Sequence, residues 1–391
     1  MSETNPTRIV LAGGGTTGHI APMIATAEAL ARMQPGVQLA CIGTAKGLET
    51  RLVPAAGLQL ELIPPVPMPR KPTLELARVP GRLAGSVRRA GQILDAHQAQ
   101  AVVGFGGYVS MPAYLAARRR GLPVVIHEGN AVPGLANKVA ARFARRVLTS
   151  FPGTTLPRRE QVGLPVRREL SELAVAGRQG RRAAARQQFG LDPERPTLLV
   201  TGGSQGARSI NTATLAARDE LLAAGVQILH IWGPKNFTDD LTVVRDQGSG
   251  AAYHPVGYVD GMENAYAAAD MMVSRSGAGT VFEAAITALP TIFVPLPHGN
   301  GEQARNAADL VAAGGGVLVP DAELDGARLA REVLGRINDA EVLATMGRVG
   351  PTMFDADAAD AVARIVLDCA RDARKRRGEQ NPTTEGGNHV A

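Results

Sequence analysis

The chain has 391 residues, of which 45% are hydrophobic and 20% are charged. This composition is typical of a folded globular protein and excludes disordered and fibrous classes, and the length is sufficient for two domains with ordinary cores. No stretch is apolar for long enough to predict a membrane-spanning helix, and the polar residues 1–7 do not resemble a secretory signal. The two cysteines, Cys41 and Cys369, lie far apart and indicate a reducing compartment without a disulfide.

The net charge of +6 is unevenly distributed, with arginine pairs and triplets concentrated between Arg70 and Arg186. Such an asymmetry suits an anionic membrane surface or an anionic substrate. Solvated arginines in a protein from a GC-rich genome would give the same pattern, so both interpretations stay open. Only 4% of the residues are aromatic and no recognition motif is present, which argues against nucleic-acid binding.

The first half of the chain alternates strand and helix patterns with the spacing of βαβ units. The proline-rich stretch 63–69 predicts an exposed loop, because proline cannot occupy a helix interior or a central strand. The alternation stops between Leu164 and Gly190, where we place the domain boundary, with 166–190 as a linker. Strands are expected at 8–12, 38–42, 59–63, 100–103, 123–126 and 146–149, and helices at 19–33, 47–56, 73–96, 109–120 and 133–143.

The second half resumes the same alternation and ends in two helical segments, 325–348 and 355–374. The polar tail 374–391 predicts disorder. Alternating βα order in both halves predicts an α/β protein with mostly parallel sheets covered on both faces. Strands are expected at 197–201, 226–232, 252–257, 271–274, 291–294 and 316–319, and helices at 206–223, 261–268, 279–288 and 302–313.

Three short apolar strands each run into a glycine-rich loop that opens a helix, at residues 13–18, 104–107 and 202–206. The start of a helix has unpaired N–H groups and a partial positive charge, and glycine lets an anion approach them closely. Two such loops in the first half and one in the second predict a pair of Rossmann-like domains that face a shared phosphate-binding cleft.

His19 directly follows the last glycine of the first loop. The second strand does not end in the acidic residue of a dinucleotide site, which argues against a nicotinamide cofactor. An imidazole at this helix start could act as a base or as a cation for phosphate. A histidine that only caps its own helix would give the same pattern, and the residues alone leave both interpretations open.

A second polar group, His127-Glu128-Gly129-Asn130, follows a strand directly, with Asn137 further along. Polar side chains at the carboxyl ends of parallel strands lie where open α/β sheets bind ligands. A metal site is the competing interpretation, but the spacing lacks the helical pair of histidines and a third ligand.

In the second half, Arg275-Ser276-Gly277-Ala278-Gly279 follows a strand and offers backbone donors to a diphosphate. Glu283, one turn into the next helix, could accept hydrogen bonds from a ribose, or it could be a capping-box acid. Gln303 begins a further helix and suits sugar hydroxyls. The sequence contains no Ser/His/Asp arrangement, no Walker lysine loop and no DxD motif, so we expect neither a metal nor a cofactor.

These strings, in this order over roughly residues 8–370, resemble the MurG family of bacterial transferases. The carrying motifs are Phe105-Gly106-Gly107-Tyr108-Val109-Ser110, His127-Glu128-x-Asn130, residues 202–208 with Asn211, and Arg275-Ser276-Gly277-Ala278 with Glu283. The resemblance implies a GT-B fold. An acceptor domain, 1–165, would receive the last helix, about 350–373, and a donor domain would span 191–349.

The resemblance also implies transfer of N-acetylglucosamine from UDP-N-acetylglucosamine to lipid I, which gives lipid II. The backbone of Val259 would contact uracil, Glu283 would bind the ribose, and Gln303 would bind the sugar hydroxyls. The remaining implied binding residues are Thr16, Thr17, Gly18, Asn130 and Arg167 from the first domain and linker, and Ser204, Ala278, Gly279, Thr280, Val281 and Phe282 from the second, supported by Tyr108, Asn137, Gln205, Asn211 and Arg275. This chain departs from the family pattern at Thr17, Gly129, Leu164 and Glu302.

The expected mechanism is an inverting, metal-independent transfer in which His19 is the candidate base and Glu128 the second candidate. The lipid-linked acceptor implies peripheral docking on the cytoplasmic face of the membrane, through the loop 64–68 and helix 73–96, and association with a cell-wall synthesis complex. A core-packed helix with solvated arginines would give the same pattern at 73–96. A UDP-sugar epimerase and a non-catalytic UDP-sugar sensor are the alternative functions.

Overall fold

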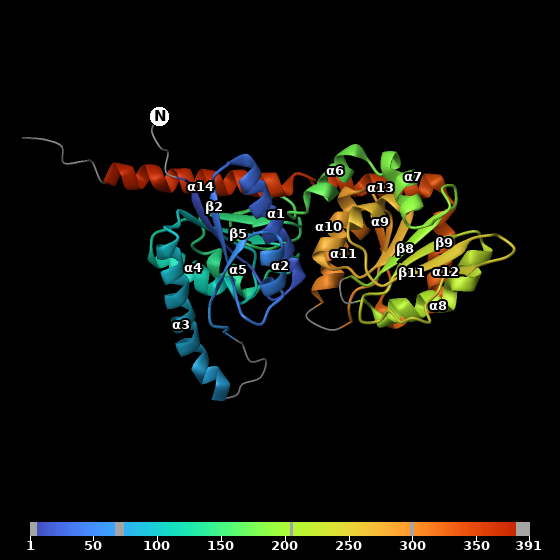
Figure 1. The fold of residues 1–391 in the computed structure, drawn as a ribbon, viewed down its shortest axis with the longest axis horizontal. Helices are drawn as coiled ribbons and strands as arrows, with labels where there is room; N and C mark the ends of the chain where they lie inside the picture. The colour runs from blue at the N-terminus through green and yellow to red at the C-terminus, as the bar shows by residue number, and fades with distance from the viewer. Residues whose placement is uncertain (1–5, 67–73, 204–205, 298–300, 381–391) are drawn as a thin grey trace, which may run out of the picture.

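The computed structural model describes residues 6–66, 74–203, 206–297 and 301–380. Two α/β domains lie side by side, and the long C-terminal helix runs along the first of them (Figure 1). Within the described residues, each domain is built on one seven-stranded sheet. The predicted pair of Rossmann-like domains with parallel sheets is therefore confirmed.

All described strands of the N-terminal sheet are parallel, in the order β3-β2-β1-β4-β5-β6-β7. The order reverses between β1 and β4, and ligands bind in open α/β sheets beyond the carboxyl ends of the strands at such a point. The strands are β1 (Arg8–Ala12), β2 (Gln38–Gly43), β3 (Gln59–Leu62), β4 (Ala101–Gly104), β5 (Val124–Glu128), β6 (Arg146–Thr149) and β7 (Arg159–Gln161), and the helices are α1 (Thr17–Met33), α2 (Glu49–Ala55), α3 (Leu74–Ala96), α4 (Ser110–Arg119) and α5 (Leu135–Ala140).

The C-terminal sheet has the order β10-β11-β9-β8-β12-β13-β14, in which only β10 runs antiparallel to its neighbour among the described strands. The strands are β8 (Thr197–Thr201), β9 (Gln227–Ile231), β10 (Val244–Arg245), β11 (Ala252–Val256), β12 (Met271–Ser274), β13 (Thr291–Phe293) and β14 (Gly316–Leu318), and the helices are α8 (Arg208–Ala223), α9 (Met262–Ala268), α10 (Ala278–Ile286), α11 (Glu302–Ala312), α12 (Gly326–Ile337) and α13 (Ala340–Met353).

The central strands are buried on both faces because helices cover both sides of each sheet. In β1, Val10 belongs to the core on one face, while Ile9 and Leu11 belong to the core on the other. Helix α14 (Ala358–Gln380) contributes Val362 and Val366 to that second core, packed against α1. The end of the chain thus completes the core of the first domain.

The segment expected to be a linker, 166–190, instead forms two helices, α6 (Arg168–Ala176) and α7 (Gln179–Gln188). Leu170, Leu173 and Ala185 are buried in the core of the C-terminal domain. The helical pattern of α7 is hard to recognise in the sequence, because this helix presents mainly arginines, and few apolar residues, to its neighbours.

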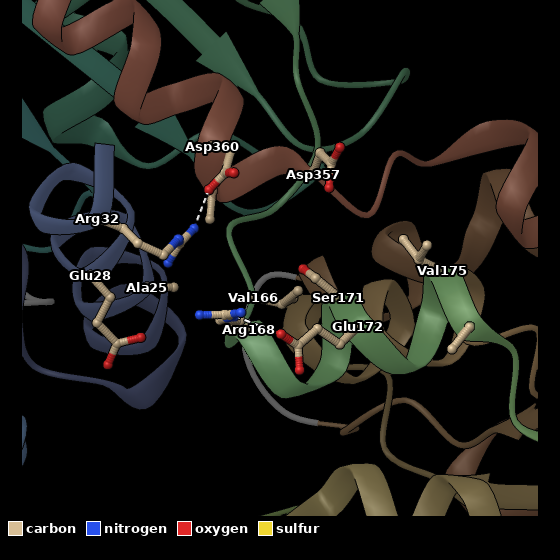
Figure 2. A pocket seen from close by; sticks show the side chains of 12 residues that line it. Ala25, Glu28, Arg32, Val166, Arg168, Ser171, Glu172, Val175, Asp357 and Asp360 are labelled. Atoms are coloured by element: carbon tan, nitrogen blue, oxygen red, sulfur yellow. Dashed lines mark hydrogen bonds and ion pairs between the residues drawn. The ribbon is translucent and has the colours of Figure 1, made fainter. Parts of the chain in front are cut away.

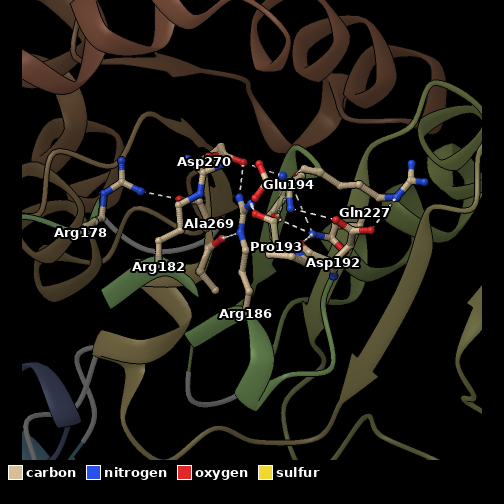
Figure 3. A network of polar contacts seen from close by, with 12 residues as sticks. Arg178, Arg182, Arg186, Asp192, Pro193, Glu194, Gln227, Ala269 and Asp270 are labelled. Carbon is tan, nitrogen blue, oxygen red and sulfur yellow. Dashed lines mark hydrogen bonds and ion pairs between the residues drawn. The ribbon is translucent and has the colours of Figure 1, made fainter. Parts of the chain in front are cut away.

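Three arginines at successive turns attach α7 to the C-terminal domain (Figure 3). Arg178 donates to the carbonyls of Thr287 and Ala288, where α10 ends, and also to Ala269. These bonds satisfy carbonyls that have no partner within their own helices, at ends where a positive charge is favourable. Burial lowers the pKa of Arg178 to about 10.

Arg186 is fully buried and forms an ion pair with Asp270 at 2.7 Å. Its other nitrogens donate to the carbonyls of Ala268 and Pro193. Asp270 also pairs with Arg182 at 3.0 Å and accepts from the Thr197 N–H at 2.8 Å.

Two further expectations about the C-terminal region are corrected. The predicted helix 325–348 is two helices, α12 and α13, because Asp339 caps α13 through the N–H groups of Glu341 and Val342. The predicted disordered tail begins too early, since α14 continues to Gln380. The expected loop at 63–69 is irregular as far as Val66, and its remainder, like 381–391, lies outside the described residues.

Candidate functional site

Two of the three glycine loops meet where the strand order reverses, after β1 and after β4. Gly107 has a φ of +79°, and a side chain there would lie 2.6 Å from the carbonyl oxygen of Gly14. Only glycine allows this conformation and this close approach together. The loop after β4 therefore covers the loop after β1 and borders the ring of His19.

His19 lies half-buried in the first turn of α1. Its Nδ1 atom is 3.2 Å from the Gly14 carbonyl oxygen and 3.2 Å from Thr16 Oγ1. Because a carbonyl oxygen only accepts, this contact requires a proton on Nδ1, and in the neutral ring Nε2 then carries the lone pair. Thr16, Thr17 and Gly18 are exposed beside it.

Glu49 was not foreseen from the sequence, although it is fully buried beside the first glycine loop. One carboxylate oxygen accepts from the Gly15 N–H at 3.0 Å, and the other accepts from the Thr44 N–H and hydroxyl, both at 2.9 Å. Burial acts to raise the pKa of Glu49, but these hydrogen bonds outweigh it and the pKa is lowered. The clustering of glycines before Glu49 was the only signal available in the sequence.

A cavity of about 320 Å³ opens beside His19. One wall consists of the first glycine loop and Glu49, and another of the segment that begins with the exposed Tyr108. The residues Ile63–Val66 add an apolar wall. A site with a histidine at one end and apolar walls suits a ligand that has both polar and apolar parts.

Glu128 is buried and makes three hydrogen bonds. Its carboxylate accepts from the N–H groups of Asn130 and Gly134, both at 3.0 Å, and from Asn137 Nδ2 at 2.9 Å. Tyr114 donates to Asn137 Oδ1 at 2.8 Å. The network fixes the loop that carries Asn130 between β5 and α5.

His127 is buried beneath this loop, with Nε2 2.8 Å from the Gly163 carbonyl oxygen. Burial lowers the pKa of His127 to about 4, so the ring is neutral near pH 7. Its Nδ1 atom is buried without a hydrogen-bond partner.

Two departures from the family pattern are in contact. A side chain at Gly129 would lie 3.3 Å from Leu164 Cδ1, so the small residue gives room to the larger one. Thr17 begins α1 and does not have a positive φ, so its side chain is accommodated. Glu302 is exposed in the first turn of α11, where a negative charge is favourable.

Asn130 joins the two domains through Asn306 of α11. Asn306 Oδ1 accepts from the Ala131 N–H at 2.9 Å, and its Nδ2 atom lies 3.4 Å from Asn130 Oδ1. The same Nδ2 atom is 3.4 Å from the Ser276 carbonyl, in the turn before α10. The structure thus brings Asn130, in the loop after β5, to the predicted turn of the second domain.

Glu283 lies half-buried on α10, and Tyr266 donates to its carboxylate at 2.7 Å. Burial raises the pKa of Glu283, while the Tyr266 hydrogen bond and the positive charge of Arg167 oppose the rise. Arg167 is exposed at the start of α6. A carboxylate with a perturbed pKa between the domains is typical of a functional position.

Arg275 is bound within its own domain. Its guanidinium pairs with Asp321 at 2.5 Å and contacts Ser209 Oγ at 3.0 Å and the carbonyls of Val294 and Pro295, both at 3.2 Å. It borders a cavity of about 570 Å³ next to the start of α8. Arg275 therefore holds the ends of β12 and β13 together.

The remaining predicted residues of the second domain surround the start of α10. Ala278, Gly279 and Thr280 form its first turn, after the extended residue Gly277. Val259, Val281 and Phe282 are buried, so they can offer a ligand only their backbone. Gln303 Oε1 accepts from the Leu296 N–H at 3.0 Å. Ser204 and Gln205 lie outside the described residues.

Asn211 belongs to a closed ring of buried hydrogen bonds. Trp232 Nε1 donates to the Tyr253 hydroxyl at 2.8 Å, and this hydroxyl lies 3.0 Å from His230 Nδ1. His230 Nε2 lies 3.2 Å from Asn211 Oδ1, and Asn211 Nδ2 donates to the Trp232 carbonyl at 3.3 Å. Burial lowers the pKa of His230 to about 3, so the ring is neutral. The Trp232 carbonyl lies against Gly206, so the network supports the third glycine loop.

Another cavity, of about 540 Å³, lies where the chain passes between the domains (Figure 2). It is lined by α1, α6 and the start of α14, and an ion pair between Arg32 and Asp360 crosses it. The described residues contain no group of three or more histidine, cysteine or acidic side chains that could hold a metal ion. No described helix has the length and apolar character needed to cross a membrane.

Comparison with known proteins matches each half of the chain to one domain of the same glycosyltransferase family. Residues 9–149 match the glycosyltransferase family 28 N-terminal domain, and residues 197–362 match the family 28 C-terminal domain. A relative from Cutibacterium acnes, named UDP-N-acetylglucosamine--N-acetylmuramyl-(pentapeptide) pyrophosphoryl-undecaprenol N-acetylglucosamine transferase, is 58% identical over 93% of this chain and 97% of its own length. The chain belongs to the MurG family.

Other members and solved structures agree with this assignment. A relative of the same name from Nocardioides is 53% identical over 92% of this chain and 98% of its own. The crystal structure of Acinetobacter baumannii MurG is 26% identical, with a TM-score of 0.75 over 93% of this chain and all of that one. The glycosyltransferase SsfS6 from Streptomyces, crystallised with thymidine diphosphate, shares the fold at 18% identity, with a TM-score of 0.60 over 93% of this chain and 99% of its own.

Proposed function

We propose that this chain transfers N-acetylglucosamine from UDP-N-acetylglucosamine to undecaprenyl-diphospho-N-acetylmuramoyl-pentapeptide (lipid I), which forms lipid II for peptidoglycan synthesis. The observation that carries the proposal is the 58% identity, over nearly its whole length, to a relative that bears this activity as its name. The neighbouring positions of the glycine loops, Asn130 and the turn before α10 support it.

The donor binds mainly to the C-terminal domain. The first N–H groups of α10, at Ala278–Thr280, have no partner within their helix. They donate to the diphosphate, which the partial positive charge at this end of the helix also attracts. Glu283 accepts from the ribose hydroxyls, and Gln303 contacts the sugar. The Val259 backbone meets uracil, and the loop that contains Ser204 completes the diphosphate site.

The acceptor binds in the cavity beside His19. The acceptor hydroxyl gives its proton to His19 Nε2 and attacks the anomeric carbon. The bond from that carbon to the UDP oxygen breaks, and UDP departs with the electron pair, so the configuration inverts. Backbone N–H groups and Arg167 stabilise the charge that develops on UDP. Glu128 positions Asn130, and Arg275 positions the turn before α10.

The test is a transfer assay with a soluble lipid I analogue and UDP-N-acetylglucosamine. The expected product is the β-linked disaccharide, and activity should persist in excess chelator. Formation of a free epimer from the donor alone would indicate an epimerase. Donor binding without any transfer would indicate a sensor, and either result would overturn the proposal.

The lipid-linked acceptor also requires that the protein dock peripherally on the cytoplasmic face of the membrane. The candidate surface is α3, where Arg88 and Arg89 are exposed, together with the loop that begins at Pro64. Vesicle flotation should show binding to anionic vesicles and little to neutral ones, and charge reversal at both arginines should weaken it. Equal binding to both kinds of vesicle would contradict this surface.

A further inference from the structure

A single peptide group lies between the buried carboxylate of Glu49 and the ring of His19. The amide between Gly14 and Gly15 contributes its N–H to Glu49 Oε2 at 3.0 Å. Its carbonyl oxygen lies 3.2 Å from His19 Nδ1. A trans peptide directs its N–H and C=O to opposite sides, so the carboxylate and the imidazole lie on either side of one planar group.

We propose that Glu49 is a positioning residue for His19 and acts on it through the Gly14–Gly15 peptide group. The inference rests on the role of His19 as the base in the proposed transfer. A carboxylate that accepts from an N–H polarises that amide and makes its carbonyl a stronger acceptor. The stronger acceptor holds the proton on His19 Nδ1, orients the ring, and leaves the Nε2 lone pair for the acceptor hydroxyl.

The surroundings of Glu49 keep its carboxylate ionised and fixed. Three hydrogen bonds to its oxygens lower its pKa, so the carboxylate is charged when the ring must receive a proton. A side chain at Gly47 would lie 1.8 Å from Oε2, so a glycine is required there for the carboxylate to reach the loop. The arrangement resembles a catalytic carboxylate–histidine pair, with one amide inserted between the two groups.

The arrangement also explains why the first glycine loop is only partly available to an anion. The Gly15 N–H is occupied by Glu49, whereas Thr17 and Gly18 are exposed at the start of α1. The inner part of the loop therefore serves His19, and the outer part faces the ligand.

The experiment compares Glu49→Gln with Glu61→Gln, which removes a half-buried carboxylate from β3 of the same domain. Glu49→Gln should lower kcat about 10- to 100-fold, which is part of the roughly 10²- to 10⁴-fold that general base catalysis contributes. The KM for UDP-N-acetylglucosamine should be unchanged. Glu61→Gln should leave both constants at their wild-type values.

The same substitution is then made in the His19→Ala background, where it should cause no further loss, because residues that act as a unit are not additive. A merely structural role of Glu49 would lower kcat by the same factor in both backgrounds and would overturn the inference. Loss of donor affinity in step with kcat would do so as well.

A spectroscopic measurement on the wild-type protein does not depend on the folding of any variant. Nitrogen-15 NMR of labelled histidine, with the His19 signal assigned by its absence in His19→Ala, should show the Nδ1-protonated tautomer. The Nε2-protonated tautomer would overturn the inference. A wild-type protein that does not transfer the sugar refutes the proposed function, and a fully active His19→Ala refutes the base assignment. An impaired His19→Ala together with a fully active Glu49→Gln refutes the present inference alone.

Discussion

At the scale of single residues, the proposed chemistry depends on groups held by backbone contacts rather than on free side chains. His19 contacts a carbonyl, Glu49 accepts from two N–H groups, and Glu128 accepts from two more. Such contacts fix the position of a side chain because the loop itself is fixed. Substitutions at these residues therefore change both geometry and charge.

Replacement of His19 by alanine tests the proposed base. We expect kcat to fall by a factor of about one hundred or more, because general base catalysis contributes roughly 10²- to 10⁴-fold. UDP affinity should stay near its wild-type value, since the donor binds to the other domain. Steady-state kinetics and calorimetry with UDP measure the two quantities. Equal loss of both would reassign His19 to binding or folding.

We expect the Glu283 carboxylate to lower the stability of the folded protein and to contribute to donor binding. Because its folded-state pKa is raised, the folded protein binds more protons than the unfolded one above the ordinary carboxyl pKa. The ionised carboxylate therefore costs stability as pH rises through that window. Glu283→Gln should unfold at the same or a higher temperature at pH 7, and it should bind UDP-N-acetylglucosamine at least tenfold more weakly, about 1.4 kcal/mol.

The two properties of Glu283→Gln are measured separately, by thermal unfolding over a range of pH and by donor titration. A variant with a lower unfolding temperature at pH 7 and intact donor binding would contradict the prediction. Tyr266→Phe is the matched control, because it removes the hydrogen bond to the carboxylate and keeps the charge.

At the scale of elements, α7 shows how a polar helix becomes part of a core. Its inward face is made of arginines that bind the carbonyl ends of α9 and α10, and α10 also carries the proposed diphosphate site at its other end. Helix α7, which has the composition of a linker, thus stabilises the donor domain at the end of α10 opposite to the proposed diphosphate site.

Arg186→Met should destabilise the protein by about 3 kcal/mol, because removal of one member of a buried ion pair leaves several buried polar groups with fewer partners. Asp270 would lose one of its two arginines, and the Ala268 and Pro193 carbonyls would lose their donor. Arg181→Met, at an exposed position of the same helix, should change stability by no more than about 0.5 kcal/mol. Urea unfolding measures both. Similar values for the two variants would show that the buried pair does not stabilise the domain.

At the scale of the whole molecule, polar side chains of the C-terminal domain bind backbone groups of the first domain. Asn306 links α11 to the Asn130 loop, and Asp309 accepts from the Gly153 N–H at 3.1 Å. The chain crosses between the domains before α6 and again before α14, beside the cavity that contains the Arg32–Asp360 pair (Figure 2). Relative motion of two such domains often accompanies substrate binding.

Asn306→Ala should raise the KM for the donor and lower kcat/KM about tenfold, because it removes the hydrogen bonds that hold the first domain to the turn before α10. Asp309→Ala, which removes one exposed contact, should have less than a threefold effect, as a surface pair contributes about 1 kcal/mol or less. Steady-state kinetics and small-angle scattering with and without UDP would measure activity and closure. Equal effects of the two variants would show that Asn306 has no special place in the interface.

The sequence by itself determined two mostly parallel sheets, most of their strands, and the positions of the glycine loops, because these depend on short periodic patterns and on local turn chemistry. It also predicted His19, Asn130 and Glu283 as site residues, because each lies in or near a loop that opens a helix. It could not determine that α7 packs through arginines, or that Glu49 reaches the first loop. Those contacts join residues far apart in the chain or reverse the usual relation between polarity and exposure. Only the tertiary structure decides which polar groups are buried together, because burial depends on neighbours that no local pattern specifies.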